Sequence, residues 1–148
     1  MKSWREGVPQ QVQDEMDAML DHGIRLGISL LEEHGEFLPI MMAMGQDGQV
    51  AIKALQDEEL AKNAVAYAAR LAEVVANERD SLRATTSVTN GFSPERQMNL
   101  IKVDVEHRDG PCITVVAPYQ LKKPLFSKTK KVALGELAAV AGERKIWA

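Results

Sequence analysis

The sequence predicts a single α+β domain, residues 1–148, in which one antiparallel sheet of about five strands carries two main helices packed on one face. Two long stretches repeat apolar residues every three or four positions, as amphipathic helices do, while shorter stretches are apolar throughout or in alternation, as strands are. A length of 148 residues with 45% apolar and 26% charged residues suits one hydrophobic core. The expected order is helix, strand, strand, helix, three strands and a short closing helix.

The first helix is expected over residues 9–34, where one face is apolar or small. Pro9 suits an early helical position because no N–H is needed there, and Gly35 suits the left-handed residue that ends a helix. Gly23 and Gly27 lie on the same face. We expect them to let another backbone approach closely, although each glycine weakens the helix by about 1 kcal/mol relative to alanine.

Two strands follow, over 37–44 and 49–55, joined by a turn at Gly48. Pro39 has no N–H to donate, so it should lie at a sheet edge or a strand start. The first strand is apolar at both odd and even positions, including Met41, Met42 and Met44. Burial on both faces, or use of one face by a partner, explains this pattern.

The middle of the chain predicts a second helix over 57–77, because acidic residues begin it and an apolar stripe follows. A strand is expected over 82–88, then a polar loop over 89–97 that is rich in turn residues. Residues 98–107 alternate most clearly and predict a half-buried strand.

The hairpin that joins 98–107 to a strand over 112–119 has two possible registers. A loop centred on Asp109-Gly110 places His107 opposite Cys112, close enough for a thiolate–imidazole pair. A three-residue loop with a left-handed Gly110 instead aligns Ile113 with Val105 and turns Cys112 away from His107. The apolar match favours the second register and an inert cysteine.

The last quarter contains a basic segment over 122–131, followed by a short strand over 132–134 and a short helix over 135–141. The basic segment has five lysines, no acidic residue and one aromatic side chain, Phe126. A segment of this kind commonly serves only as a solvated, solubilising loop. Because the chain as a whole has a formal charge of −3, docking on an acidic protein surface is the favoured binding role, ahead of nucleic acid. Ile146 and Trp147 should pack against the core.

No motif for catalysis, cofactor binding or metal binding is present. The glycines at 45 and 48 lack the Lys-Ser/Thr of a phosphate loop, and no paired cysteines have zinc spacing. Glu32, Glu33 and His34 point in different directions on a helix and do not converge on a metal. The longest apolar run, 37–44, is too short to span a bilayer, and the lone cysteine suits a reducing cytoplasm.

Two stretches carry a resemblance to known proteins. His34-Gly35-Glu36-Phe37-Leu38-Pro39, and Glu106-His107-Arg108-Asp109-Gly110 with the later Pro118-Tyr119, resemble a family of small uncharacterised bacterial α+β proteins. The similarity extends from about residue 18 to Trp147 and implies a shared fold, without catalytic residues to transfer. The order of elements is also similar to roadblock and profilin-like domains, which are protein-interaction modules that often dimerise.

The sequence therefore favours a non-catalytic, cytoplasmic, protein-binding module that forms a homodimer. Its surface would lie near the first helix and the methionine-rich strand, although the same methionines equally suit the core. The alternative is a small hydrolase or transferase that uses His107, Cys112 and nearby carboxylates. The residues expected to bind a partner are Met41, Met42, Met44, Lys122, Lys123, Phe126, Lys128, Lys130 and Lys131.

Overall fold

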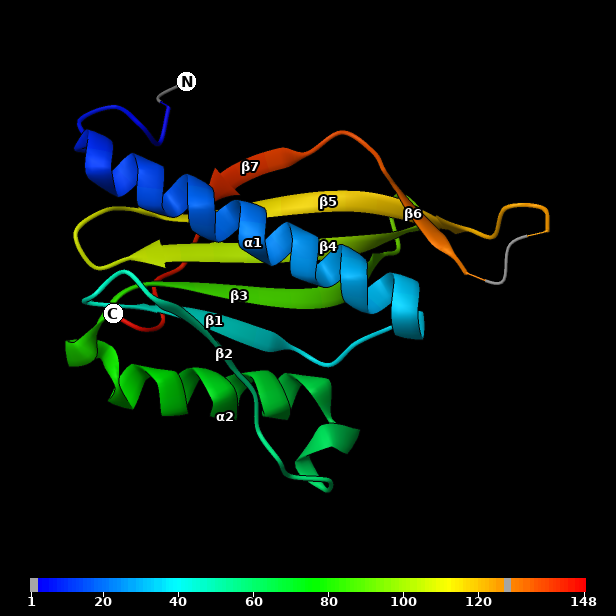
Figure 1. Ribbon diagram of the computed structural model, residues 1–148, viewed down its shortest axis with the longest axis horizontal. Helices are drawn as coiled ribbons and strands as arrows, with labels where there is room; N and C mark the ends of the chain where they lie inside the picture. The colour runs from blue at the N-terminus through cyan, green and yellow to red at the C-terminus, as the bar shows by residue number, and fades with distance from the viewer. Residues whose placement is uncertain (1–2, 127–128) are drawn as a thin grey trace.

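The computed structural model describes residues 3–126 and 129–148, which form one sheet and two main helices (Figure 1). The helices are α1 (Gln10–His34) and α2 (Ala64–Asn77), with 3-10 turns at Leu60–Lys62 and Arg79–Ser81. The strands are β1 (Ile40–Gly45), β2 (Val50–Lys53), β3 (Leu82–Ser93), β4 (Met98–His107), β5 (Cys112–Lys122), β6 (Lys131–Leu134) and β7 (Ala138–Ala141). The predicted α+β class is confirmed, but these residues form seven strands rather than about five.

All strand pairs are antiparallel, and the sheet order is β2-β1-β3-β4-β5-β6. Strand β7 also pairs with β5, so β6 and β7 follow one another along the same edge of that strand (Figure 1). The predicted closing helix over 135–141 is therefore wrong. Strand β5 is much longer than β6, so part of its edge is left for residues 138–141 to pair with. The backbone hydrogen bonds of that pairing override the local helix propensity of these residues.

The two helices lie on opposite faces of the sheet, which corrects the prediction that both pack on one face. Helix α1 packs with Met42 and Met44 in one buried cluster, whereas α2 packs with Met41 and Ala43 in another. Neighbouring residues of a strand point to opposite faces, so β1 is covered on both sides. Its apolar residues at both odd and even positions reflect this double burial.

Helix α1 crosses β3 and β4 at close range, and its bounds agree with the prediction. A Cβ atom at Gly23 would lie 2.6 Å from Cγ2 of Thr86, and one at Gly27 would lie 3.1 Å from Cγ2 of Ile101. At both glycines, the space that a Cβ atom would fill is occupied by side chains of the sheet, not by another backbone as predicted. Gly35 ends the helix in the left-handed conformation, with φ 81°, and its N–H bonds to the carbonyl of Leu31.

The β4–β5 hairpin adopts the register with the three-residue loop. Val105 pairs with Ile113, and Glu106 pairs with Cys112. Gly110 does not have a positive φ, so the prediction that it is left-handed is wrong. The glycine is needed for a close approach instead, because a Cβ atom there would lie 2.6 Å from Cγ1 of Val12 on α1.

Strand β3 continues to Ser93, so half of the predicted 89–97 loop belongs to the sheet. Residues 89–93 pair with 98–102 of β4, and this pairing extends a strand that the polar sequence alone did not indicate. In the described part of the chain, no helix is long and apolar enough to cross a membrane.

Candidate functional site

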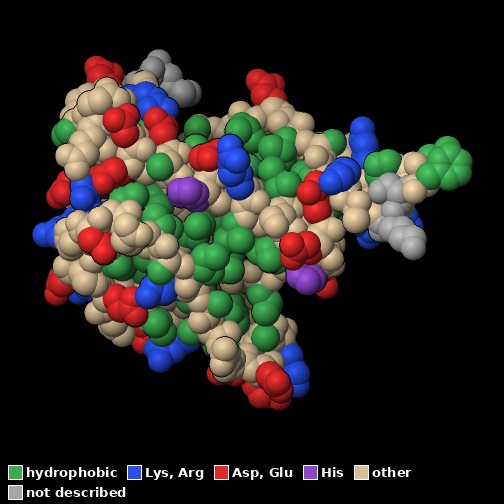
Figure 2. Space-filling model, viewed as in Figure 1, with side chains coloured by type: hydrophobic (Ala, Val, Ile, Leu, Met, Phe, Trp, Pro, Cys, Tyr) green, Lys and Arg blue, Asp and Glu red, His purple; other side chains and the backbone are tan. Residues whose placement is uncertain are grey.

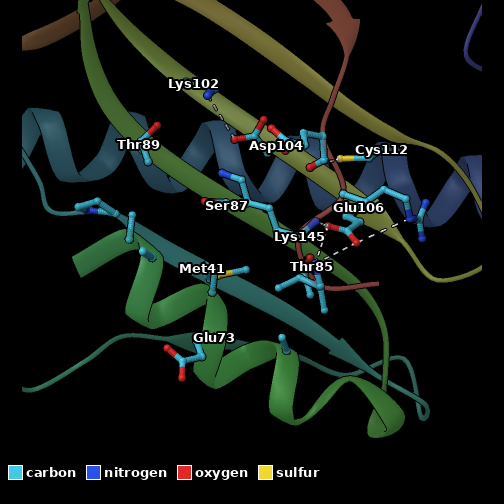
Figure 3. Close-up of a pocket in the computed structure, with 18 of the residues that line it drawn as sticks. Met41, Glu73, Thr85, Ser87, Thr89, Lys102, Asp104, Glu106, Cys112 and Lys145 are labelled. Atoms are coloured by element: carbon cyan, nitrogen blue, oxygen red, sulfur yellow. Dashed lines mark hydrogen bonds and ion pairs between the residues drawn. The ribbon is translucent and has the colours of Figure 1, made fainter. Parts of the chain in front are cut away.

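A groove opens on the face of the sheet that carries α2, because α2 covers β1 and leaves β3, β4 and the start of β5 exposed on that side (Figure 3). Its volume is about 930 Å³. The sheet forms its floor, α2 forms one wall, and the C-terminal residues 143–148 close one end. Phe37 and Pro39, which precede β1, also line it.

A row of hydroxyl groups runs along the floor. Thr85, Ser87 and Thr89 share one face of β3 and line the groove. Alternate residues of a strand lie about 6.8 Å apart, so the three hydroxyls repeat at that spacing. None of them makes a hydrogen bond to another described residue through its side chain, although Thr85 is only 2% exposed. The hydroxyls of Ser87 and Thr89, which are half-buried, are therefore open to a ligand, whereas Thr85 is almost fully buried.

Strand β4 adds charge to the floor, beside the hydroxyl row. Lys102 pairs with Thr89, and Asp104 pairs with Ser87, so these side chains stand next to one another (Figure 3). The ammonium of Lys102 lies 3.9 Å from a carboxylate oxygen of Asp104, and the other oxygen accepts the hydroxyl of Thr114. Lys102 remains half exposed and is available to an acceptor on a bound molecule.

The wall of the groove is smooth and apolar. Its α2 residues are small or aliphatic apart from Glu73: Ala64, Val65, Ala68, Ala69, Ala72 and Ala76. Tyr67 and Leu71 on the same helix point into the core, where the Tyr67 hydroxyl donates to the carbonyl of Leu55 at 2.9 Å. Val65 is 81% exposed at the rim. The groove therefore has a polar side and an apolar side.

The C-terminal end of the chain is held in place by two side chains. The carboxylate of Glu106, which is 4% exposed, accepts the backbone N–H groups of Lys145, Ile146 and Trp147 at 2.7–3.1 Å. The guanidinium of Arg144 donates to the carbonyls of His107, Gly110 and Trp147. This end wall of the groove is thus fixed by buried, charge-assisted hydrogen bonds.

Cys112 lies at the same end of the groove and is not arranged as a nucleophile. Burial, with Glu106 and Asp104 nearby, raises the pKa of its thiol from an ordinary 9.0 to about 11. Its Sγ donates to the carbonyl of Glu143 at 3.5 Å. A reactive cysteine needs a lowered pKa, so this thiol is almost entirely protonated at neutral pH.

His107 faces the opposite side of the sheet, because adjacent residues of β4 alternate and Glu106 is the one that pairs with Cys112. Its Nδ1 accepts the N–H of Asp109 at 2.9 Å, which places the proton of a neutral ring on Nε2. That proton is donated to Glu15 at 3.0 Å, and Glu15 also pairs with Arg83 at 2.6 Å. The structure does not bring His107 and Cys112 together.

No group of three or more histidine, cysteine or acidic side chains within 3–126 and 129–148 is arranged to hold a metal ion. The carboxylate of Glu32 instead accepts the backbone N–H of Val132 at 2.9 Å. His34 lies 3.6 Å from Glu33 on the surface. The acidic end of α1 therefore braces β6.

The residues expected to bind a partner are placed in two very different settings. Met41, Met42 and Met44 are 4–8% exposed and fill the two cores, so they present no surface in the monomer, as the core interpretation of the methionines requires. The described residues of the basic segment, 122–126 and 129–131, by contrast, project from the body of the molecule (Figure 2). Phe126 is 99% exposed there, flanked by the exposed residues Lys122, Lys123, Lys130 and Lys131; Lys128 lies outside the described residues.

No protein-family model, curated protein or solved structure matches the chain. The resemblances drawn from the sequence motifs and from the order of elements therefore stay predictions. The closing helix that the roadblock and profilin-like order requires is replaced by β7.

The sequence did not point to the groove. Thr85, Ser87 and Thr89 alternate along β3, but the sequence predicts a loop from residue 89, and alternating hydroxyls are common in strands. Lys102, Asp104 and Glu106 alternate within residues 98–107, but that alternation predicts only a half-buried strand. The signal in the sequence was that polar side chains occupy alternate positions in both β3 and β4, and the structure places these two strands side by side.

Proposed function

We propose that the protein is a non-catalytic, cytoplasmic binding module whose groove, between α2 and the polar face of β3 and β4, holds a segment of another polypeptide. The observation that carries this proposal is the pair of half-buried, unpartnered hydroxyls at Ser87 and Thr89, in line with the buried Thr85, beneath an apolar helix wall. A polypeptide segment offers backbone donors and acceptors to such a floor and apolar side chains to such a wall.

The shape of the groove favours a chain over a small molecule. Its volume of about 930 Å³ lies within the range for small-ligand pockets, about 300–1,000 Å³, so the argument depends on the elongation of the groove and on the spacing of its hydroxyls. Helix α2 runs alongside the strands, so the space between them is elongated (Figure 3). The hydroxyl spacing of about 6.8 Å equals the two-residue repeat of an extended peptide.

The chemistry of the site supports binding rather than catalysis. The thiol nearest the groove has its pKa raised to about 11, and the buried imidazole lies on the other face of the sheet. The charged groups at the closed end already hold the C-terminal residues through Glu106 and Arg144. Enzymatic use of His107 and Cys112 would need both to be rearranged.

A blocked groove tests the proposal. Random peptides displayed on phage are selected on the purified protein, and the enriched sequences are synthesised for fluorescence anisotropy. Ser87→Trp fills the floor and should raise Kd at least about tenfold. Asn99→Trp, an exposed position on β4 outside the groove, should leave Kd within about twofold.

Circular dichroism first confirms that both variants fold. Failure to enrich any peptide, or equal binding by the wild type and Ser87→Trp, contradicts a polypeptide-binding groove. Binding of small molecules in the groove by a protein that binds no peptide also contradicts the proposal, because the proposed occupant is a polypeptide segment.

A second candidate surface is the basic segment that joins β5 to β6. Leu125 and Phe126 are 85% and 99% exposed at its end, with lysines on both arms. Exposed apolar side chains inside a basic patch favour docking on an acidic protein surface. Phe126→Ser combined with Lys123→Glu should abolish salt-sensitive binding to an acidic peptide; unchanged binding contradicts this role.

A further inference from the structure

Most of the charged side chains that line the groove are already bonded within the chain. The carboxylate of Glu106 accepts three backbone N–H groups, and the guanidinium of Arg144 donates to three carbonyls. Asp104 accepts a hydroxyl from β5, and Glu73 forms an ion pair at 3.1 Å with an arginine of its own helix. These four groups are satisfied without a ligand.

The ammonium of Lys102 differs, because it makes no hydrogen bond to any described residue. The carboxylate oxygen of Asp104 that it faces lies 3.9 Å away, which is beyond hydrogen-bonding distance. The Lys102 side chain is 49% exposed against 19% for Asp104, so the cation is the more accessible of the two charges. Its three N–H donors are therefore open to an acceptor that enters the groove.

A second donor stands directly across from Lys102. Thr89 on β3 pairs with Lys102 on β4, and the Cβ atoms of such a pair are about 4.5–5.5 Å apart (Figure 3). The Thr89 hydroxyl is half-buried and has no hydrogen-bond partner in the described part of the chain. A carboxylate offers two oxygens and about four acceptor sites, so one carboxylate can bond to both side chains at once.

The direction of a bound segment determines which of its residues reach Lys102. Its backbone faces the hydroxyls of the floor, so its side chains point sideways, alternately to one side and to the other. Helix α2 covers β1, and β4 lies on the other side of β3. One set of side chains therefore faces the alanines of α2, and the alternate set faces β4. A residue that points toward Lys102 has two neighbours that point toward the apolar wall.

We propose that the groove selects segments in which an acidic residue stands between two apolar residues, and that its carboxylate bonds to Lys102 and Thr89. This inference rests on the proposed binding of a polypeptide segment in the groove. The small side chains of α2 leave room for the two apolar neighbours. A basic residue in place of the acidic one would face an ammonium and be rejected.

Phage selection on the purified protein gives the first readout, because the enriched peptides should share an acidic residue between two apolar ones. One such peptide is synthesised with acetyl and amide ends, so that its carboxylate belongs to a side chain, and is compared with the analogue in which that carboxyl is an amide. Wild-type protein should bind the amide analogue about fivefold more weakly. Lys102→Gln should bind the two peptides within about twofold of each other, because the carboxylate then has no cation.

Charge reversal separates recognition from a structural role of the lysine. Lys102→Glu should bind a peptide with lysine at the acidic position more tightly than wild-type protein does. Arg25→Glu makes the same change in net charge at an exposed position of α1, on the opposite face of the sheet. This control should leave Kd of the acidic peptide within about twofold, and circular dichroism confirms that each variant folds.

The outcomes distinguish this inference from the function on which it rests. Failure to enrich any peptide overturns both. Enriched peptides that lack an acidic residue between apolar ones overturn the selectivity alone. An amide analogue that loses as much affinity for Lys102→Gln as for wild-type protein also overturns it, because the carboxylate is then bound elsewhere, as on the basic segment that joins β5 to β6.

Discussion

The buried carboxylate of Glu106 in β4 accepts the backbone N–H of Trp147 at 2.7 Å, across 41 positions of the chain. Lys145 and Ile146 donate to the same carboxylate, and this places the Ile146 side chain, 3% exposed, in the core beneath α2. One acidic side chain thus replaces the ladder partner that the last residues lack. It also shapes the closed end of the groove.

Glu106→Gln should destabilise the protein by about 2 kcal/mol, because the amide nitrogen would face N–H donors and leave them unpaired in a buried site. Urea unfolding measures the loss, and hydrogen exchange should show residues 145–147 opening first. The control is Glu143→Gln, an exposed position, which should change stability by less than about 0.5 kcal/mol. Equal stability of the two variants contradicts the anchoring role of Glu106.

Cys112 should react slowly with a disulfide reagent at neutral pH. A thiol pKa near 11, against an ordinary 9.0, leaves about 100-fold less thiolate, so the rate should be about 100-fold below that of the unfolded chain. A rate close to that of a free thiol would show that Cys112 is activated, and would favour the enzymatic alternative.

The same shift gives a pH dependence of stability. The pKa of the folded thiol lies above that of the unfolded one, so this contribution is complete below about pH 9 and is lost as pH rises towards about 11. Urea titrations from about pH 8 to about pH 11 should therefore show a decline that Cys112→Ala removes. An unchanged slope in Cys112→Ala contradicts the assignment.

Gly23→Ala should destabilise the protein despite the higher helix propensity of alanine. The new Cβ atom would lie 2.6 Å from Thr86 and 3.1 Å from Val103, so α1 must lift from the sheet. Overpacking costs about 1–3 kcal/mol and the propensity gain is about 1 kcal/mol, which leaves a net loss of about 1–2 kcal/mol. Gly91→Ala, with nothing within 4 Å, is the control. Stabilisation by Gly23→Ala would contradict the close packing.

Glu15→Leu should cost about 2 kcal/mol, because it leaves the Nε2–H of His107 without an acceptor in a side chain that is 2% exposed. Glu15→Gln keeps one acceptor and should lose less. Asp21→Asn on the same helix removes only an exposed ion pair with Arg25 and should cost less than about 0.5 kcal/mol. Thermal unfolding measures the stability of the three variants. A loss for Glu15→Leu no greater than that for Asp21→Asn would contradict the role of Glu15 as the acceptor for His107.

Local patterns predicted the parts of the fold that depend on short-range chemistry. The bounds of α1, the alternation of β4 and the three-residue loop after His107 all follow from residues within one or two turns or strands of each other. The apolar match that favoured Val105 opposite Ile113 is the match that the structure contains.

The errors occur where a distant segment decides. Residues 135–141 have local helix propensity, yet the free edge of β5 draws 138–141 into β7. The polar stretch 89–93 becomes strand because β4 pairs with it. The apolar residues at both odd and even positions of β1 indicate that both faces of this strand are covered, and α1 and α2 do cover opposite faces. The pattern does not say which helix covers which face.

By itself, the sequence determined that this chain forms an α+β domain with a long glycine-bearing helix, and it favoured the hairpin register that separates His107 from Cys112. Only the tertiary structure decided that α2 covers one part of its sheet face, which leaves the hydroxyl row of β3 open. Only the tertiary structure placed residues 138–141 on the edge of β5 as strand β7. The physical reason is that periodicity reports whether a side chain is buried, whereas a groove or an edge depends on which distant segment does the burying.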